Sequence, residues 1–209
     1  MSAPFDPAEA TAALADADPV LGAWIARHGP LAYEPHAMAP FPYLLRAIVY
    51  QQLAGKAAAT IHGRVVALFD GAPTPEAVLA TPDEPLRGAG LSRNKLAALR
   101  DLAARTLDGT VPADLDALHP LPDDEVVRRL TAVRGVGPWT VEMLLIFNLG
   151  RPDVLPVTDL GVRRGFSVLY GGDGLPSPAA LLAHGERWRP WRSVASRYLW
   201  RAADTAQTP

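Results

Sequence analysis

The sequence predicts an all-α protein built from many short helices. Apolar residues recur at helical spacing along most of its 209 residues, and no convincing β-strand stands out. The 21 prolines and 17 glycines fall mostly between these apolar segments, where such residues end helices and form turns. With 49% hydrophobic residues the chain is long enough and apolar enough to bury a core, as one domain or as two small lobes.

The helices of the first half carry start and stop signals. Residues 18–29 begin with an aspartate cap and a proline in the first turn, and they end at a glycine. Ser92 caps the segment that follows it. Gly63 weakens the helix expected over residues 56–69 without ending it. The helices expected in this half are 18–29, 41–52, 56–69, 74–80 and 92–109.

The stretch LTAVRGVGPWTVE, residues 130–142, predicts a tight hairpin between two helices. Gly135 and Gly137 can adopt backbone angles that cost other residues energy, and Pro138 suits the first turn of a helix. One helix therefore ends near Arg134 and the next begins at Pro138. Main-chain amides at a helix start form a site for an anion such as phosphate, which is a first indication of nucleic acid.

One long break interrupts the helices of the second half. Residues 148–159 contain two prolines and a glycine, and we expect them to cross between lobes, with Asp159 opening the next helix. Acids at the start of the segment 122–133 and arginines further along it suit the helix dipole. The helices expected in this half are 122–133, 138–149, 159–170 and 186–203.

Composition excludes several kinds of site. Cysteine is absent, which excludes disulfides, thiol catalysis, cysteine–zinc sites and iron–sulfur clusters. No run of about 18 uncharged apolar residues predicts a transmembrane helix. The acidic N-terminal segment lacks a signal-peptide pattern, so we expect a cytoplasmic protein.

Charge is distributed unevenly, although the net charge is only −2. Between residues 163 and 201 only Asp173 and Glu186 oppose seven arginines, which favours one cationic face. Exposed arginines on a solvated helix are the plainer alternative. The seven are Arg163, Arg164, Arg187, Arg189, Arg192, Arg197 and Arg201.

Several residues have both a structural and a functional interpretation. Asp159 is a helix cap, a carboxylate presented to a substrate, or both. The segment ERWRPWRS, residues 186–193, sets two tryptophans among arginines, which suits stacking on bases and contact with phosphates better than a core. Arg93 lies at the tip of a turn, from which it can push into a duplex. The adjacent Gln51 and Gln52 either satisfy a helix junction or include one that faces DNA, and we expect the structural role for at least one of them.

Together these stretches resemble the helix-hairpin-helix DNA glycosylases, and most closely the 3-methyladenine DNA glycosylase II (AlkA-like) family. The resemblance rests on the hairpin, on an aspartate 22 residues beyond Gly137, and on the segment RPWRS, which follow in family order. It covers most of the chain from Asp18 to Ala203. It implies two helical lobes with a DNA-binding cleft between them: residues 1–40 plus 152–209, and residues 41–151, which carry the hairpin.

The resemblance also implies roles for individual residues. Asp159 is the catalytic carboxylate, and Trp139 and Trp191 line the base pocket. Met143 and Leu160 take positions that are aromatic in some members, so we expect a wider pocket. The DNA contacts implied are the hairpin amides of Gly135, Val136 and Gly137, then Thr140, Gln52 and Arg163, and the loop of Ser92 and Arg93 as the wedge that fills the gap left by the flipped nucleotide. The main-chain carbonyls implied as ligands of a monovalent cation, Na⁺ or K⁺, are those of Thr131, Arg134 and Val136.

The implied reaction is the excision of alkylated bases, such as 3-methyladenine and 7-methylguanine, from double-stranded DNA by a monomeric base excision repair enzyme. Strand cleavage in related enzymes uses a hairpin lysine, and Trp139 takes that position here, so the resemblance implies an intact abasic site. The missing cysteines argue against the iron–sulfur branch. No further cofactor and no membrane partner are expected, and the protein would act in a bacterial cytoplasm, associated with the nucleoid through DNA.

Three other functions fit parts of the sequence. A glycosylase for a neutral lesion, such as uracil or hypoxanthine, would use the same motifs with a different pocket. A non-catalytic hairpin module would only bind the DNA backbone, and Asp159 at the expected offset argues against it. A helical protein with no DNA role would lack the salt-dependent binding to duplex that counterion release produces.

Overall fold

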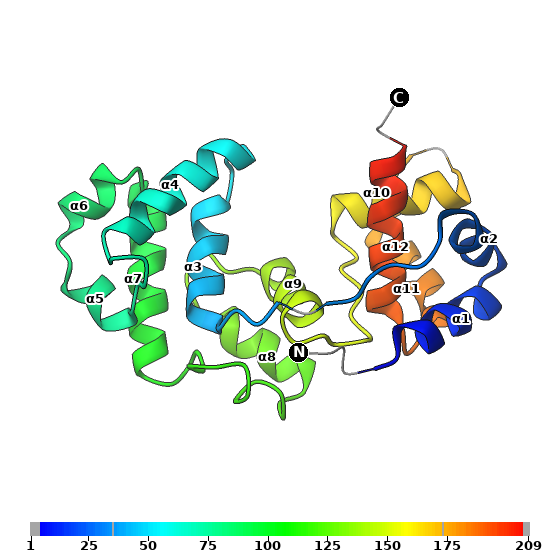
Figure 1. The fold of residues 1–209 in the computed structure, drawn as a ribbon, viewed down its shortest axis with the longest axis horizontal. Coiled ribbons are helices and arrows are strands. Elements are labelled where there is room, and N and C mark those ends of the chain that lie inside the picture. The colour runs from blue at the N-terminus through cyan, green and yellow to red at the C-terminus, as the bar shows by residue number, and fades with distance from the viewer. Residues whose placement is uncertain (1–4, 35, 173, 207–209) are drawn as a thin grey trace. The chain divides into compact units, whose positions relative to one another are not determined.

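The computed structural model describes residues 5–34, 36–172 and 174–206. These residues form twelve α-helices, one 3₁₀-helix and no β-strand, which confirms the predicted all-α class (Figure 1). In chain order the helices are α1 (Pro7–Ala17), α2 (Pro19–His28), α3 (Pro40–Tyr50), α4 (Gly55–Ala67), α5 (Pro75–Ala80), α6 (Asp83–Gly88), α7 (Arg93–Leu107), α8 (Asp123–Leu130), α9 (Pro138–Phe147), α10 (Leu160–Tyr170), α11 (Pro178–Gly185), η1 (Glu186–Trp188) and α12 (Arg192–Thr205). None of the described helices has the length and apolar character needed to cross a membrane.

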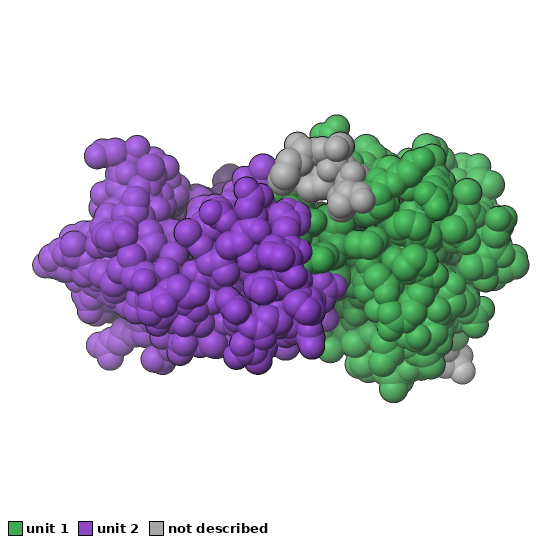
Figure 2. All heavy atoms as spheres, turned by 90° about the horizontal axis from the view of Figure 1, so that it is seen from below, with its two compact units in different colours: residues 1–36, 145–209 green, residues 37–144 purple. Residues whose placement is uncertain are grey.

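The chain divides into two compact units, coloured separately in Figure 2. Unit 1 comprises Met1–His36 and Leu145–Pro209, and unit 2 comprises Ala37–Leu144. Helix α9 therefore begins in unit 2 and ends in unit 1. The sequence analysis expected the lobe that carries the hairpin to comprise residues 41–151, so both of its predicted boundaries lie a few residues further along the chain than those of unit 2.

The predicted start and stop signals of the helices act locally. Oδ1 of Asp18 accepts hydrogen bonds from the amides of Val20 and Leu21, and Gly29 ends α2 with a φ of 78°. Ser92 caps α7 in the same way. The prediction missed three helices, α1, α6 and α11. Asp6 before Pro7 starts α1 with the same pair of residues that starts α2, so the signal was present in the sequence.

The single helix expected over residues 186–203 is wrong. The chain forms η1, turns at a cis peptide bond between Arg189 and Pro190, and only then begins α12. Proline lacks the amide hydrogen that a helix interior needs, and its ring collides with the preceding turn. Pro190 is therefore the physical reason for the break.

Unit 2 has an aliphatic core. Leu44, Leu45 and Ile48 of α3 and Leu99 and Leu102 of α7 are buried. Arg100, also on α7, donates hydrogen bonds to three carbonyls at the end of α5. Its Nη1 donates to the oxygens of Val78 (2.6 Å) and Leu79 (2.9 Å), and its Nη2 to that of Thr81 (2.5 Å). A guanidinium thereby satisfies carbonyls that have no partner within their own helix.

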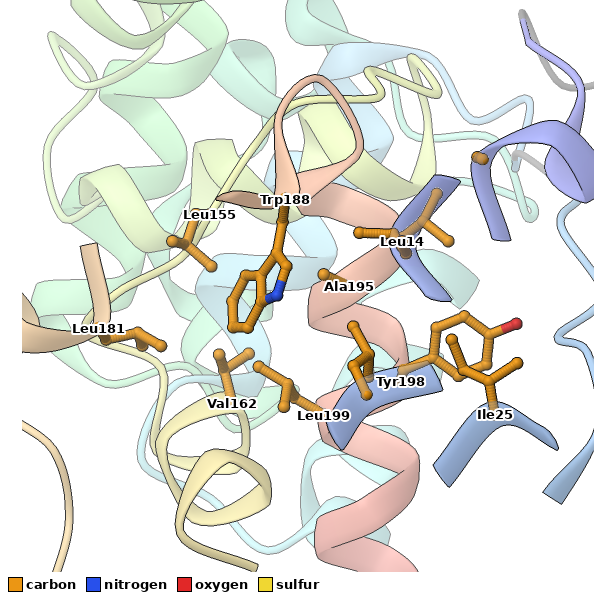
Figure 3. Packing of buried hydrophobic residues seen from close by; sticks show 12 residues of the cluster. Leu14, Ile25, Leu155, Val162, Leu181, Trp188, Ala195, Tyr198 and Leu199 are labelled. Atoms are coloured by element: carbon orange, nitrogen blue, oxygen red, sulfur yellow. The ribbon is translucent and has the colours of Figure 1, made fainter. Parts of the chain in front are cut away.

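Unit 1 has an aromatic core around Trp188. The side chain of Trp188 is fully buried, and Figure 3 shows its indole among Leu155, Leu181 and Val162. Trp188 is therefore not one of the surface rings that the segment ERWRPWRS predicted. Its apolar neighbours come from segments far apart in the chain, such as Leu14, Val162 and Leu181, and sequence spacing alone does not show that they meet.

A buried aspartate joins this core to α2. Oδ2 of Asp18 accepts hydrogen bonds from Nε1 of Trp188 (2.9 Å), the hydroxyl of Tyr170 (2.7 Å) and Nε2 of His184 (3.1 Å). Burial alone raises the pKa of the Asp18 carboxyl, but the donors Trp188 and Tyr170 outweigh it and hold the pKa below its ordinary value of 3.8. The network ties α2 to α10, α11 and η1.

Helices α10 and α12 approach each other closely. A Cβ on Gly165 of α10 would lie 1.8 Å from the carbonyl oxygen of Leu199 on α12, so only glycine fits there. One turn earlier on α10, a Cβ on Gly161 would lie 2.7 Å from Cδ1 of Trp200. The two glycines let α12 place Trp200 against the start of α10.

Candidate nucleic-acid interface and carboxylate site

The predicted hairpin joins α8 to α9 in unit 2. Gly135 has a φ of 78°, a left-handed conformation that favours glycine. The amide of Val136 donates to the carbonyl of Val133 (3.1 Å), and the Val136 side chain is buried. The carbonyl of Gly137 accepts the first amide hydrogen bond of α9, from Thr140 (3.0 Å). The sequence therefore located the turn and the start of α9, whereas α8 ends at Leu130, four residues before the predicted end near Arg134.

The hairpin leaves two of its three predicted amides for a ligand. Within the described parts of the chain, the amides of Gly135 and Gly137 donate no hydrogen bond. The amide of Val136 is already used within the hairpin. Amides at the start of a helix attract an anion through their hydrogens and through the helix dipole. The predicted phosphate site thus reduces to Gly135 and Gly137, and Val136 contributes packing.

Two side chains of unit 2 hold the hairpin in place. Nε2 of Gln51 donates to the carbonyl of Gly135 (2.8 Å), and Oδ2 of Asp101 accepts from the amide of Arg134 (2.7 Å). Gln51 is thus the glutamine that satisfies a junction, as the sequence predicted for one of the two. The contact joins residues 84 positions apart, and no local pattern pairs them.

Lys95 fixes the segment that carries Gln51. Its Nζ donates to the carbonyls of Val49 (2.6 Å) and Gln51 (2.7 Å) at the end of α3. Burial lowers the pKa of this ammonium. A cation at the C-terminal end of a helix is favourable, because the last carbonyls carry partial negative charge. Lys95 therefore has a structural task in unit 2.

The turn between α3 and α4 presents an apolar tip that the sequence reading missed. Gln52 is exposed and has a φ of 56°, which is uncommon outside glycine. The next side chain, Leu53, is 39% exposed. Arg93, the predicted wedge, is also exposed. It is the first residue of α7 and directly follows the cap Ser92. Leu53 is therefore a second wedge candidate, because apolar side chains also insert between bases. The exposure of Leu53 and the strained backbone of Gln52 are visible in the structure and not in the sequence.

Asp159 is the cap of α10, and it lies in unit 1. Its Oδ1 accepts from the amide of Val162 (2.7 Å) and from Nε1 of Trp200 (2.8 Å). The residue is only 9% exposed. The sequence expected a cap that also serves as a carboxylate for chemistry; the cap is present, and Trp200 is a partner that the sequence reading did not find.

The other predicted site residues differ in exposure. Trp139 and Leu160 are each 47% exposed, Met143 is buried one turn after Trp139 on α9, and Trp191 is half-buried with its ring 5.3 Å from that of Phe5. Residues as exposed as Trp139 and Leu160 are available to a ligand. Stacking of a base on Trp139 and Trp191 stays a prediction.

Two predicted DNA contacts are engaged within the protein. The Thr140 side chain is buried, and its carbonyl accepts from the hydroxyl of Tyr43 (3.4 Å). Nε of Arg163 donates to the carbonyl of Pro176 (2.9 Å). A buried threonine is a poor candidate for direct contact with DNA, and we assign Thr140 to the support of α9.

Most arginines of the predicted cationic face have partners inside unit 1. Arg189 and Arg192 form ion pairs with Asp153 and Glu186. Arg197 and Arg201 donate to main-chain carbonyls between residues 28 and 32. Arg164 and Arg187 are exposed. Most of these arginines therefore fit neither the predicted cationic face nor the alternative of exposed arginines on a solvated helix, because they bond to groups within unit 1.

The chain is similar to known DNA repair proteins. The profile of the HhH-GPD superfamily base excision DNA repair proteins matches residues 45–190. A curated relative, DNA-3-methyladenine glycosylase 1 of Schizosaccharomyces pombe, is 38% identical over 169 residues, which are 80% of this chain and 74% of the relative. Among solved structures, a 3-methyladenine DNA glycosylase of S. pombe in complex with abasic DNA superposes with a TM-score of 0.81 at 35% identity, covering 92% of this chain and 95% of the other. A DNA-3-methyladenine glycosidase of Bacillus halodurans gives 0.86 at 37% identity, covering 98% and 93%.

Proposed function

Because the chain belongs to the HhH-GPD superfamily of base excision DNA repair proteins, we propose that it is a monofunctional alkylbase DNA glycosylase. Its substrates are alkylated bases in double-stranded DNA, such as 3-methyladenine and 7-methylguanine, and its product is an intact abasic site. The observation that carries the proposal is the buried carboxylate of Asp159, 22 residues beyond Gly137 in the order of the family. The names of the relatives supply the substrate class.

The hairpin binds the DNA backbone in this proposal. The amides of Gly135 and Gly137 donate to a phosphate oxygen, and Gln51 fixes the turn by donating to the carbonyl of Gly135, in the peptide between Gly135 and Val136. Moving the target base out of the duplex costs a few kcal/mol, and a side chain that fills the gap offsets part of this cost. Arg93 and Leu53 are the two candidates for that side chain, one polar and one apolar.

Asp159 acts on the sugar. Alkylation at purine N3 or N7 makes the base a cation, so it is already a good leaving group and stacks well on a tryptophan face. As the N-glycosidic bond breaks, positive charge grows on the sugar. A fixed carboxylate stabilises that charge where water is excluded, and it can also orient the attacking water.

The proposal includes no strand cleavage. A lyase forms a Schiff base through a free amine, and the chain has two lysines, Lys56 and Lys95. The ammonium of Lys95 is bound to the carbonyls of Val49 and Gln51. Lys56 is exposed in the first turn of α4, outside the hairpin.

We also propose that the hairpin binds a monovalent cation. In the described parts of the chain, the carbonyl oxygens of Thr131, Arg134 and Val136 accept no hydrogen bond, so they are available as ligands. Na⁺ or K⁺ held there would fix the turn and add positive charge beside the phosphate. We further propose that the enzyme acts as a monomer on DNA in the cytoplasm.

The test is release of bases from methylated duplex DNA by the wild type and by Asp159→Asn. Products are identified by chromatography, and the strands are examined for nicks. We expect 3-methyladenine or 7-methylguanine from the wild type, nearly none from the variant, and unbroken strands. Release of only uracil or hypoxanthine from a matched panel would instead assign a neutral-lesion glycosylase. Salt-dependent duplex binding with no release of any base would leave a binding module.

A further inference from the structure

Two hydrogen bonds converge on one oxygen of Asp159. The amide of Val162 and Nε1 of Trp200 both donate to Oδ1, at 2.7 and 2.8 Å. A carboxylate on a short side chain rotates broadly about its last torsion, so a cap bond alone leaves its plane free to swing. A second donor on the same oxygen, approaching from another helix, fixes that plane.

The structure also fixes the ring that supplies the second donor. The indole of Trp200 stacks on the ring of Phe147, with centroids 5.5 Å apart and planes inclined by 30°. The indole also lies against α10 at Gly161, where a Cβ would lie 2.7 Å from Cδ1 of the indole and 3.1 Å from both its Nε1 and Oδ1 of Asp159. The ring is therefore held between an aromatic face and a glycine.

We propose that Trp200 is a positioning residue of the glycosylase reaction: its indole N–H fixes the carboxylate of Asp159 in the orientation that meets the positive charge on the sugar. This inference rests on the proposed catalytic role of Asp159. Preorganisation is the physical reason, because a charge that already points at the reacting atom does not have to reorient as the transition state forms. Trp200 touches neither the base nor the sugar in this assignment.

The experiment measures binding to two DNA duplexes that differ only in charge at the target sugar. One carries a pyrrolidine, which is a cation at neutral pH, and the other a neutral tetrahydrofuran. The ratio of the two dissociation constants reports the carboxylate directly. We expect the wild type to prefer the cation, and Trp200→Phe, which keeps the ring and removes the donor, to reduce this preference about tenfold. Affinity for the neutral duplex should stay within about twofold, since no DNA contact is removed.

A second variant and a matched control complete the design. Gly161→Ala places a Cβ 2.7 Å from Cδ1 of the indole and 3.1 Å from Oδ1 of Asp159. It therefore disturbs both partners of the contact with Trp200 still in place, and it should also reduce the preference. Trp188→Phe removes the equivalent indole donor from Asp18 and should lower thermal stability while leaving the preference unchanged. Single-turnover base release by Trp200→Phe should fall about tenfold at saturating enzyme, with substrate affinity kept.

The outcomes separate this inference from the function on which it rests. Unchanged preference in Trp200→Phe and Gly161→Ala overturns the positioning role, and so does an equal loss of affinity for both duplexes, which would indicate packing alone. Asp159→Asn is expected to abolish the preference for the cation. If Asp159→Asn retains it, the catalytic role of Asp159 is wrong, whatever Trp200 does.

Discussion

Asp18 and Asp159 are two aspartates of unit 1 that begin helices in the same way and differ in how their oxygens are used. Each caps a helix through Oδ1, and each accepts a hydrogen bond from a tryptophan indole. At Asp18 the indole bond falls on Oδ2, together with bonds from Tyr170 and His184. At Asp159 the cap and the indole bond share Oδ1.

We propose that this difference separates a structural carboxylate from a catalytic one. Donors on both oxygens of Asp18 hold the charge within the core, where the residue is 1% exposed. At Asp159 the bonds from Val162 and Trp200 meet on Oδ1 and orient the carboxylate, and that residue is 9% exposed. A helix cap by itself therefore does not identify a function, because these two capping aspartates have different partners.

Asp18→Asn tests the structural member of the pair. An amide presents an NH₂ group to donors that need an acceptor, so the buried network loses partners. We expect the free energy of unfolding at neutral pH to fall by about 2–4 kcal/mol, measured by urea denaturation. Asp6→Asn, at the exposed cap of α1, is the control and should cost less than about 1 kcal/mol. Equal losses of unfolding free energy in the two variants would show that the buried network at Asp18 adds nothing beyond an ordinary helix cap.

Gly135→Ala extends the comparison to the hairpin before α9, where the chain has no aspartate cap and glycines precede the helix. Alanine at a φ of 78° is strained by about 1–2 kcal/mol, although its Cβ would meet only Cβ of Ala98 at 3.6 Å and Oε1 of Gln51 at 4.0 Å. We expect affinity for undamaged and abasic duplexes to fall together by about tenfold, measured by titration. Gly63→Ala, in the exposed interior of α4 and with no neighbour within 4 Å, should leave affinity unchanged. Unaltered binding by Gly135→Ala would mean that the hairpin amides are not the phosphate site.

The pH dependence of stability sharpens the contribution of Asp18. Its pKa in the folded protein lies below the ordinary value of 3.8, so the native state favours the charged form. Stability from this group is therefore present above about pH 4 and is lost as pH falls through the lower, folded-state pKa. The difference in unfolding free energy between the wild type and Asp18→Asn should shrink from about pH 6 to about pH 3. A difference in unfolding free energy that stays constant over this pH range would contradict the role of the hydrogen bonds to Asp18.

The sequence predicted what is encoded locally. The cap, the first-turn proline and the terminal glycine of α2 lie within a dozen residues, and so do the glycines and the proline of the hairpin. It did not predict what distant partners decide. The bond from Gln51 to Gly135 joins residues 84 positions apart, and the bond from Trp200 to Asp159 joins residues 41 positions apart. The burial of Trp188 likewise depends on side chains from distant segments.

The most direct test of the central claim compares Asp159→Asn and Asp18→Asn in one pair of assays, single-turnover base release from methylated duplex DNA and urea denaturation. We predict that Asp159→Asn releases base about 10²–10³-fold more slowly and that its unfolding free energy changes by less than about 1 kcal/mol. Asp18→Asn, assayed where it is folded, should release base at the wild-type rate and show the larger loss of stability. A folded, fully active Asp159→Asn would contradict the account, and so would a folded Asp18→Asn that releases base as slowly as Asp159→Asn.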